Sequence, residues 1–429
     1  MKNNVKNLIE FIDHSPSCFH VIENARKQFL EHGFTELEEK EYWDLEEGKS
    51  YFVTRNGSSM IAFHLPKKDF QGFHIVASHS DSPTYRIKEQ PEMSVEKHYT
   101  KLNIERYGGM IPETWFDRPL SVAGRIIIEE NGQIKDQLVN IDRDLMIIPN
   151  LAIHMSRSSN ESKQLNPQKD LLPLCGGNLT KDGFEEMIAK ESGVEKEDIL
   201  SYDLFLYNRM RGTTLGINEE FVAAPKLDDL ECAYSSIEGI LNAKLSKDYV
   251  TVCAVFDNEE VGSGTKQGAG STFFPEVLKR ISYLCEKNEE EYYMAVADSF
   301  MLSADNAHAV HPNYQDKTDP TNRPYINEGI VLKYNASQKY TTDANSAALV
   351  KYLCKKEKIK CQVFFNRSDM LGGSTLGNIL TGQVSIKAAD IGLPQLSMHS
   401  TYETAGCKDL DDMITLMGSF YELGKEVQI

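Results

Sequence analysis

The segment Tyr249-Val250-Thr251-Val252-Cys253-Ala254-Val255-Phe256 is followed at once by Asp257-Asn258-Glu259-Glu260. Its first part is rich in β-branched and aromatic residues and carries no charge, which predicts a strand buried on both faces. Strands of this kind are typical of parallel sheets that are covered by helices. The acidic run would therefore stand at the end of a central strand, where open α/β sheets bind their ligands.

The segments on either side of this strand continue a strand-then-helix alternation. A second short apolar run, residues 72–78, predicts another buried strand, which ends at His79-Ser80-Asp81. Helices are predicted at residues 5–12, 19–31, 227–241, 274–285, 344–355 and 411–424, and further strands at residues 292–297 and 361–365. Such alternation predicts an α/β sandwich with a largely parallel central sheet.

The middle of the chain has a different character. Strand-like pieces at residues 124–129 and 203–207 are separated by polar loops, and one helix is predicted at residues 181–191. We therefore predict one discontinuous domain, residues 1–85 and 226–429, that carries the catalytic residues. Residues 86–225 would form a β-rich domain inserted into it.

The charge of the chain limits its partners. Among 429 residues, 46 Lys and Arg stand against 64 Asp and Glu, a net charge of 46 − 64 = −18, which argues against a nucleic-acid surface. No apolar run reaches the length of a membrane span, and no signal peptide opens the chain. The eight cysteines are scattered without a Cys-x-x-Cys pair, which is typical of buried thiols in a reducing compartment. We expect a cytoplasmic protein that contacts neither nucleic acid nor membrane.

Five segments place acidic and histidine residues just beyond apolar runs. They are His79-Ser80-Asp81, Lys226-Leu227-Asp228-Asp229, Asp257-Asn258-Glu259-Glu260, Ser303-Ala304-Asp305-Asn306-Ala307-His308 and Ser397-Met398-His399-Ser400. Together they supply what a two-metal hydrolase needs: histidine and carboxylate ligands, one bridging carboxylate, and one carboxylate left to accept a proton from water. In the pair Glu259-Glu260, neighbouring side chains point in different directions, so one can bind metal while the other faces the water.

Motifs along nearly the whole chain resemble the M18 metallopeptidases, the family of aspartyl aminopeptidase and vacuolar aminopeptidase I. The residues that carry the resemblance are Ala77-Ser78-His79-Ser80-Asp81-Ser82-Pro83, Tyr107-Gly108-Gly109, Thr114-Trp115-Phe116-Asp117-Arg118-Pro119-Leu120, Leu151-Ala152-Ile153-His154, Asp257-Asn258-Glu259-Glu260-Val261-Gly262-Ser263, Ala307-His308-Ala309-Val310-His311-Pro312-Asn313-Tyr314, Gly372-Gly373-Ser374-Thr375 and Pro394-Gln395-Leu396-Ser397-Met398-His399-Ser400. Two positions differ from the family pattern: Asp229 stands where Asn is common, and Tyr402 stands where Arg is common.

The resemblance implies a zinc-peptidase-like fold, a role for each site residue, and two divalent metal ions per subunit. Zinc is the expected metal, and manganese or cobalt could replace one ion. His79 and Asp305 would bind the first ion, Glu260 and His399 the second, and Asp228 both. Glu259 would be the general base for a metal-activated water, and Asp81 would orient His79.

The same resemblance implies the substrates and the assembly. The enzyme would remove N-terminal residues, chiefly Asp or Glu, from peptides with free N-termini, with His308 and Lys333 in the substrate pocket. His154 would reach a neighbouring subunit's site, because the inserted domain drives dimerisation in a homo-oligomer that can be a tetrahedral dodecamer. Two alternatives stay open: an amidase or deacetylase acting on small N-acyl compounds, and a non-catalytic scaffold of the same fold.

Overall fold

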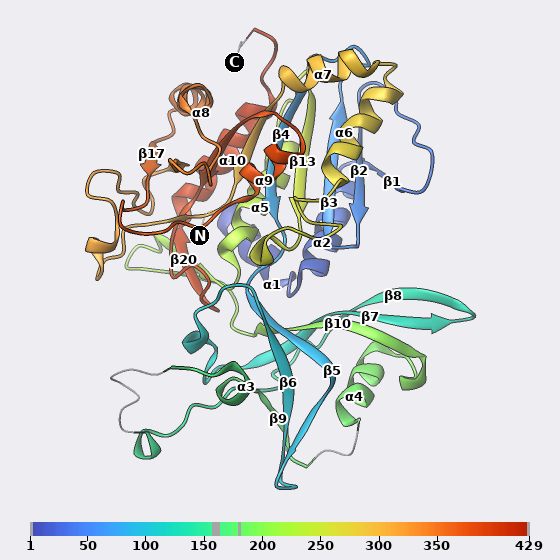
Figure 1. Cartoon of the computed structure of the whole chain (residues 1–429), viewed down its shortest axis with the longest axis vertical. Helices are drawn as coiled ribbons and strands as arrows, with labels where there is room; N and C mark the ends of the chain where they lie inside the picture. The colour runs from blue at the N-terminus through green and yellow to red at the C-terminus, as the bar shows by residue number, and fades with distance from the viewer. Residues whose placement is uncertain (1–2, 157–163, 179–181, 427–429) are drawn as a thin grey trace.

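A nine-stranded sheet forms the centre of the larger body of the protein (Figure 1). The computed structural model describes residues 3–156, 164–178 and 182–426. In order across the sheet, the strands are β1 (Thr35–Leu37), β2 (Lys49–Arg55), β3 (Ser59–Leu65), β13 (Val250–Phe256), β4 (Phe73–His79), β14 (Phe300–Ala304), β18 (Lys387–Gly392), β16 (Ile330–Lys333) and β17 (Cys361–Phe364).

The middle of this sheet is parallel. The pairs β13–β4, β4–β14 and β14–β18 are parallel, as are β1–β2 and β16–β17 nearer the edges. The pairs β2–β3, β3–β13 and β16–β18 are antiparallel. The sheet is therefore mixed, with its parallel part at the centre, as a largely parallel α/β sandwich requires.

Helices cover both faces of the central sheet. One face packs against α1 (Asn3–Asp13), α2 (Cys18–Glu31), α5 (Leu227–Asn242), α8 (Ala344–Glu357) and α10 (Cys407–Tyr421). The other face packs against α6 (Phe273–Leu284), α7 (Glu289–Ala297) and α9 (Leu376–Gln383). Along β13, Cys253 and Val255 belong to the first core, and Val252 and Ala254 to the second. The uncharged strand predicted at the outset is thus buried on both faces, because successive side chains point to opposite sides of a sheet.

The strand predicted at residues 292–297 is wrong, because this segment belongs to helix α7. The Asn288 side chain accepts from the Glu291 amide and the Glu291 side chain accepts from the Asn288 amide, a reciprocal cap that starts a helix. The buried residues Tyr292, Ala295 and Val296 have the i, i+3, i+4 spacing of one helix face. The strand of the central sheet that follows α7 is β14, which ends directly before Asp305.

A second sheet lies beside the α/β body (Figure 1) and is built from the middle of the chain. Its order is β8 (Gln133–Asn140), β7 (Leu120–Glu130), β10 (Ile199–Asn208), β5 (Thr84–Val95), β6 (Tyr99–Tyr107) and β9 (Leu174–Gly176). These strands, with α3 (Pro167–Asp170) and α4 (Gly183–Ser192), surround a separate apolar core. The helix predicted from Lys181 begins at Gly183, and Lys181 itself lies outside the described residues.

A third sheet joins segments from distant parts of the sequence. Its order is β11 (Thr213–Leu215), β12 (Phe221–Ala224), β20 (Glu403–Gly406), β19 (Pro394–Leu396) and β15 (Ala307–His308). Because β12 pairs with β20 over residues 221–224 and 403–406, the end of the predicted insertion is hydrogen-bonded to the C-terminal segment. The division at residues 85 and 225 stays a prediction.

Two further predictions concern the whole chain. Within the described ranges, none of the helices combines the length and the apolar character that crossing a membrane demands. The cysteines form no disulfide with one another in the described part of the chain.

Candidate metal centre

Three parallel strands bring distant residues to one edge of the central sheet. Strand β4 ends at His79, which is paired with Phe256 at the end of β13, and β14 lies on the other side of β4. Chain directions are the same in all three, so the residues that follow them emerge at the same edge. His79, the Asp257–Glu260 run and Asp305 are therefore neighbours, as their positions after apolar runs predict.

Asp228 lies at the centre of this group. It stands near the start of α5 with non-helical backbone angles, and its amide donates to Glu403 Oε2 at 2.9 Å. Its Oδ1 atom lies 3.5 Å from His79 Nε2, and its Oδ2 atom lies 3.2 Å from His399 Nε2. The two oxygens of one buried carboxyl thus face two histidines that are 320 positions apart in the sequence.

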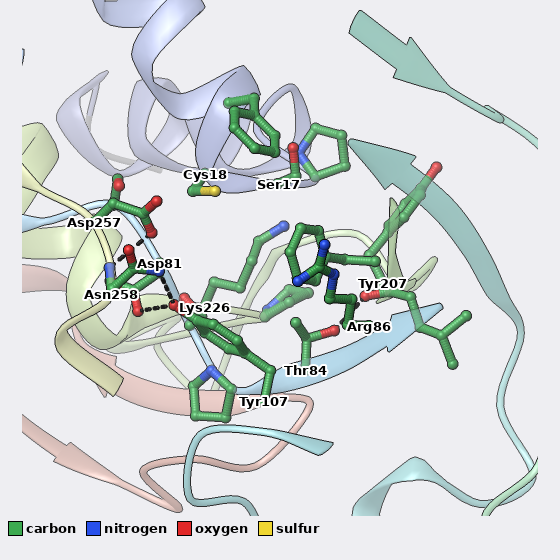
Figure 2. A pocket seen from close by; sticks show the side chains of 18 of the residues that line it. Ser17, Cys18, Asp81, Thr84, Arg86, Tyr107, Tyr207, Lys226, Asp257 and Asn258 are labelled. Carbon is green, nitrogen blue, oxygen red and sulfur yellow. Dashed lines mark hydrogen bonds between the residues drawn. The ribbon is translucent and has the colours of Figure 1, made fainter. Parts of the chain in front are cut away.

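The Glu259–Glu260 pair lies on a short 3₁₀ turn, η5 (Glu259–Val261), that Asp81 holds in place. Asp81 Oδ1 accepts from the Glu259 amide and Oδ2 from the Glu260 amide, each at 3.1 Å. Asp81 Oδ2 also accepts from the Tyr107 hydroxyl at 2.7 Å (Figure 2). On the turn, Glu260 Oε1 comes to 3.4 Å from His399 Nε2. Asp81 therefore positions both the turn and the His79 ring. The Nδ1 atom of His79 lies 3.1 Å from the Asp81 carbonyl oxygen.

The side chains form overlapping groups that can each hold a metal ion. One group contains His79, Asp228, Asp229 and Asp305, another Asp228, Glu260 and His399, and a third His79, Glu259 and Glu260; within each, the ligand atoms lie within 4.8 Å of one another. Two ligands of one tetrahedral zinc ion, each about 2.1 Å from it, are roughly 3.4 Å apart. The separations His79–Asp228, His399–Asp228 and His399–Glu260, at 3.5 Å, 3.2 Å and 3.4 Å, match that value.

The electrostatics of the cluster favour a bound cation. Burial raises the pKa of Glu259 to about 8, and burial together with the Asp228 charge raises the pKa of Glu260 well above its ordinary range. Burial also raises the pKa of Asp305. The buried atoms Asp228 Oδ1 and Asp229 Oδ1 have no hydrogen-bond partner among the described residues. Divalent cations would stabilise these ionised carboxylates and occupy the unpaired oxygens, so the residues present fit a metal centre.

A cavity of about 320 Å³ opens beside the cluster. His79, Asp228 and Glu259 line it together with His308 and Lys333, two of the residues predicted to contact substrate. The ammonium of buried Lys333 already lies 3.3 Å from Asp305 Oδ1 and donates to the Asp305 carbonyl oxygen at 2.6 Å. His154, in the turn η2 (Ile153–Met155), is exposed and does not line this cavity, so the structure does not bring it to the site within one chain.

Sequence reasoning missed the supporting residue Glu403. Its carboxyl accepts from the amides of Asp228 at 2.9 Å and His399 at 2.6 Å, which fixes two of the central residues. Asp229, one of the two departures from the family pattern, accepts from the His79 amide at 3.0 Å. The other departure, Tyr402, donates to the Arg211 carbonyl oxygen at 2.7 Å. Since Glu403 and Asp228 are 175 positions apart, no local pattern could pair them.

The three-layer α/β fold and the histidine and carboxylate cluster define a metal-dependent hydrolase of the zinc-peptidase type. The family model described as "Aminopeptidase I zinc metalloprotease (M18)" matches residues 11–421. The chain belongs to this family, and it is a metallo-aminopeptidase, a peptide hydrolase, as the sequence predicts.

Relatives and solved structures agree with this assignment. The chain is 45% identical over 437 residues to "Probable M18 family aminopeptidase 2" of Clostridium novyi, covering 99% of this chain and 100% of the relative. It is 37% identical over 422 residues to the Pseudomonas aeruginosa protein of the same name, covering 96% and 97%. The chain in "Cryo-EM structure of the Ape4 and Nbr1 complex" superposes with a TM-score of 0.93 at 36% identity, covering 97% of this chain and 85% of that one. The subunit in "Structure of S. cerevesiae mApe1 dodecamer" superposes at 0.85 with 27% identity, covering 98% and 96%.

Proposed function

We propose that the cluster is a two-metal catalytic centre in which Asp228 bridges both ions. His79 and Asp305 hold the first ion, and Glu260 and His399 hold the second. The observation that carries this proposal is the position of the Asp228 carboxyl, with one oxygen facing each histidine. Zinc is the metal we expect, and manganese or cobalt suits the same ligands. When bound, the two ions polarise the peptide carbonyl and activate a water molecule.

Glu259 is the residue that moves the proton in this proposal. It lies in the group with His79 and Glu260 and lines the cavity beside the metal ligands. Its backbone amide donates to Asp81 Oδ1, and this hydrogen bond fixes the turn that positions the Glu259 carboxyl. A carboxyl in this position can accept a proton from water and then give it to the departing amine.

The proposed substrates are peptides with a free N-terminus and an acidic first residue. Lys333 supplies the positive charge of the cavity that would receive a substrate carboxylate. His308, whose ring lies at 61° to that of Phe364 with the centroids 6.1 Å apart, forms part of the same wall. Since the Lys333 ammonium is already paired with Asp305, it would share its charge between the metal ligand and the substrate.

A homo-oligomer built from dimers, up to a tetrahedral dodecamer, is part of the same proposal. The turn that carries His154 exposes the apolar side chains Leu151, Ile153 and Met155, whose exposed fractions are 53%, 46% and 77%. Grouped apolar exposure of this kind is typical of a surface that another subunit covers. His154 would then enter a neighbouring subunit's site, with the inserted sheet, residues 86–225, forming the dimer contact. We place the enzyme in the cytoplasm, in keeping with its cysteines.

The variant Glu259→Gln tests the catalytic assignment, with the exposed Glu290→Gln in α7 as the matched control. Hydrolysis of Asp- and Leu-linked reporter amides should fall at least a thousandfold in Glu259→Gln, while its metal content equals that of the wild type. Peptides with an acetylated N-terminus should not be cleaved by any of the three proteins. Full activity of Glu259→Gln would contradict the role of Glu259, and cleavage of only acetylated peptides would favour the amidase alternative.

A further inference from the structure

Two cysteines come together where helix α8 ends and strand β17 begins. Cys354 lies in the last turn of α8, and Cys361, seven positions further on, is the first residue of β17. The helix ends at Lys358, which has a left-handed backbone conformation, and the Ile359 amide donates to the Cys354 carbonyl oxygen at 2.8 Å. A helix end of this kind reverses the chain within a few residues. The start of β17 is therefore brought back to the end of α8.

The side chains of the two cysteines lie on the same face of the central sheet. Cys354 is buried in the apolar core between the sheet and helices α5, α8 and α10, and half-buried Cys361 packs against that same core. The two thiols are in hydrogen-bonding contact with each other. This contact raises the pKa of Cys354 and lowers the pKa of Cys361, because the Cys354 S–H group donates to the ionised Cys361 sulfur. Cys361 is thus the thiol of the pair that ionises first.

Cys361 can also be reached from solvent. It lines an open cleft of about 680 Å³ together with Tyr325, Glu328 and Lys360. The cleft lies where β17 forms one edge of the central sheet (Figure 1). Cys354 lies beneath, in the core. One accessible thiol that ionises readily, beside a second thiol that is covered, is the arrangement found in cysteine pairs that respond to oxidants.

We propose that Cys354 and Cys361 form a reversible disulfide when the enzyme meets a small disulfide, the oxidised form of a low-molecular-weight thiol. The Cys361 thiolate attacks one sulfur of the small disulfide, whose S–S bond breaks and releases one small thiolate. Cys354 then loses its proton to water and attacks the Cys361 sulfur of the mixed disulfide, which releases the second small thiolate. The two cysteines lose two electrons and two protons, and the small disulfide takes up both to become two thiols.

The disulfide would fasten an edge strand that reaches the substrate cavity. Strand β17 is paired on one side only, with β16, and its last residue Phe364 stands opposite Lys333. Both Phe364 and Lys333 line the cavity beside the metal cluster. In a reducing compartment a disulfide of this kind forms under oxidative conditions and is removed when they end. The pair would therefore fix the start of β17 to α8 only while the surroundings are oxidising.

Treatment of the folded, metal-loaded enzyme with excess glutathione disulfide tests the proposal. After free thiols are blocked, the protein is digested with trypsin without reduction. Trypsin cleaves after Lys355 and Lys360, so the two cysteines fall in separate peptides, residues 352–355 and 361–367. Mass spectrometry should find these peptides joined in most chains, at about 2 Da below the summed mass of the two reduced peptides, since two hydrogen atoms are lost. A reductant should separate them.

Three variants identify the role of each thiol. Cys354→Ser keeps the accessible thiol and should stop at a mixed disulfide between Cys361 and glutathione. Cys361→Ser should leave Cys354 unmodified, because Cys354 is buried. The control Cys175→Ser removes another half-buried cysteine, which lies in β9 of the second sheet, and it should form the joined peptides as the wild type does.

The deciding measurement is made on the wild type and does not depend on how the variants fold. Absence of the joined peptides from the folded wild-type enzyme would overturn the proposal, whether Cys361 carries glutathione or stays unmodified. A joined pair that involves any cysteine other than Cys354 at Cys361 would overturn it as well.

Discussion

Asp81→Asn is the substitution that most sharply tests how the catalytic turn is held. The Asp81 carboxylate accepts three hydrogen bonds, from the Tyr107 hydroxyl at 2.7 Å and from the Glu259 and Glu260 amides at 3.1 Å. An Asn side chain has nearly the same shape but must place an NH₂ group where one carboxylate oxygen was. With the amide oxygen kept on Tyr107 and Glu260, the NH₂ group meets the Glu259 amide, and two donors face each other.

The size of the effect follows from that lost contact. A hydrogen bond to a charged group contributes about 1.5–3 kcal/mol, and a buried donor left without an acceptor costs a similar amount. We therefore expect the displaced turn to raise the activation free energy for kcat/KM by about 2–3 kcal/mol. At 1.36 kcal/mol for each factor of ten, kcat/KM should fall roughly 30- to 150-fold.

The assay is steady-state hydrolysis of an aminoacyl reporter amide, with metal content measured on the same samples. Asp136→Asn, on the exposed strand β8, is the matched control and should behave as the wild type. Asp81→Asn should keep its metal and lose activity mainly through kcat. A kcat/KM within threefold of the wild type would show that the turn does not depend on the Asp81 carboxylate.

Two further predictions address stability and specificity. His74 is buried in β4, its ring stacks on Tyr249 with centroids 4.0 Å apart, and burial lowers its pKa from 6.5 to about 3. Between pH 6.5 and 3 the unfolded chain binds a proton at this position and the folded chain does not, so stability falls as the pH falls. In urea unfolding of chelator-treated protein between pH 7.5 and pH 5, the wild type should lose about 2 kcal/mol more than His74→Phe; equal losses would show that His74 is not the group responsible. For Lys333→Met, the ratio of kcat/KM for Asp- over Leu-linked reporters should fall at least tenfold if the lysine selects acidic substrates. An equal loss for both reporters would mean that Lys333 serves only to hold Asp305.

The sequence was informative wherever a pattern was local. The uncharged run at residues 249–256 predicts the buried strand. Because the acidic run at residues 257–260 follows directly, the sequence also predicts that these residues lie at the carboxyl end of that strand. Because β4, β13 and β14 are parallel neighbours, His79, Glu259 and Asp305 meet at one edge. The prediction of a strand at residues 292–297 was wrong, because it was based on the apolar content of the segment and did not consider the helix cap formed by Asn288 and Glu291.

Contacts between distant segments could not be predicted in this way. Glu403 supports Asp228 and His399 through backbone amides, and any acidic residue placed there by the fold could do so. The Tyr107–Asp81 hydrogen bond joins the second sheet to the catalytic turn, and it depends on how two bodies of the protein pack.

The position of the metal ions is the most direct test of a two-ion centre bridged by Asp228. Crystals grown with zinc and measured at the zinc absorption edge would show each ion as an anomalous peak. Two peaks about 3.5–4 Å apart, one between His79 and Asp228 and the other between His399 and Asp228, are expected. A single peak, or two peaks of which one does not contact Asp228, would contradict it.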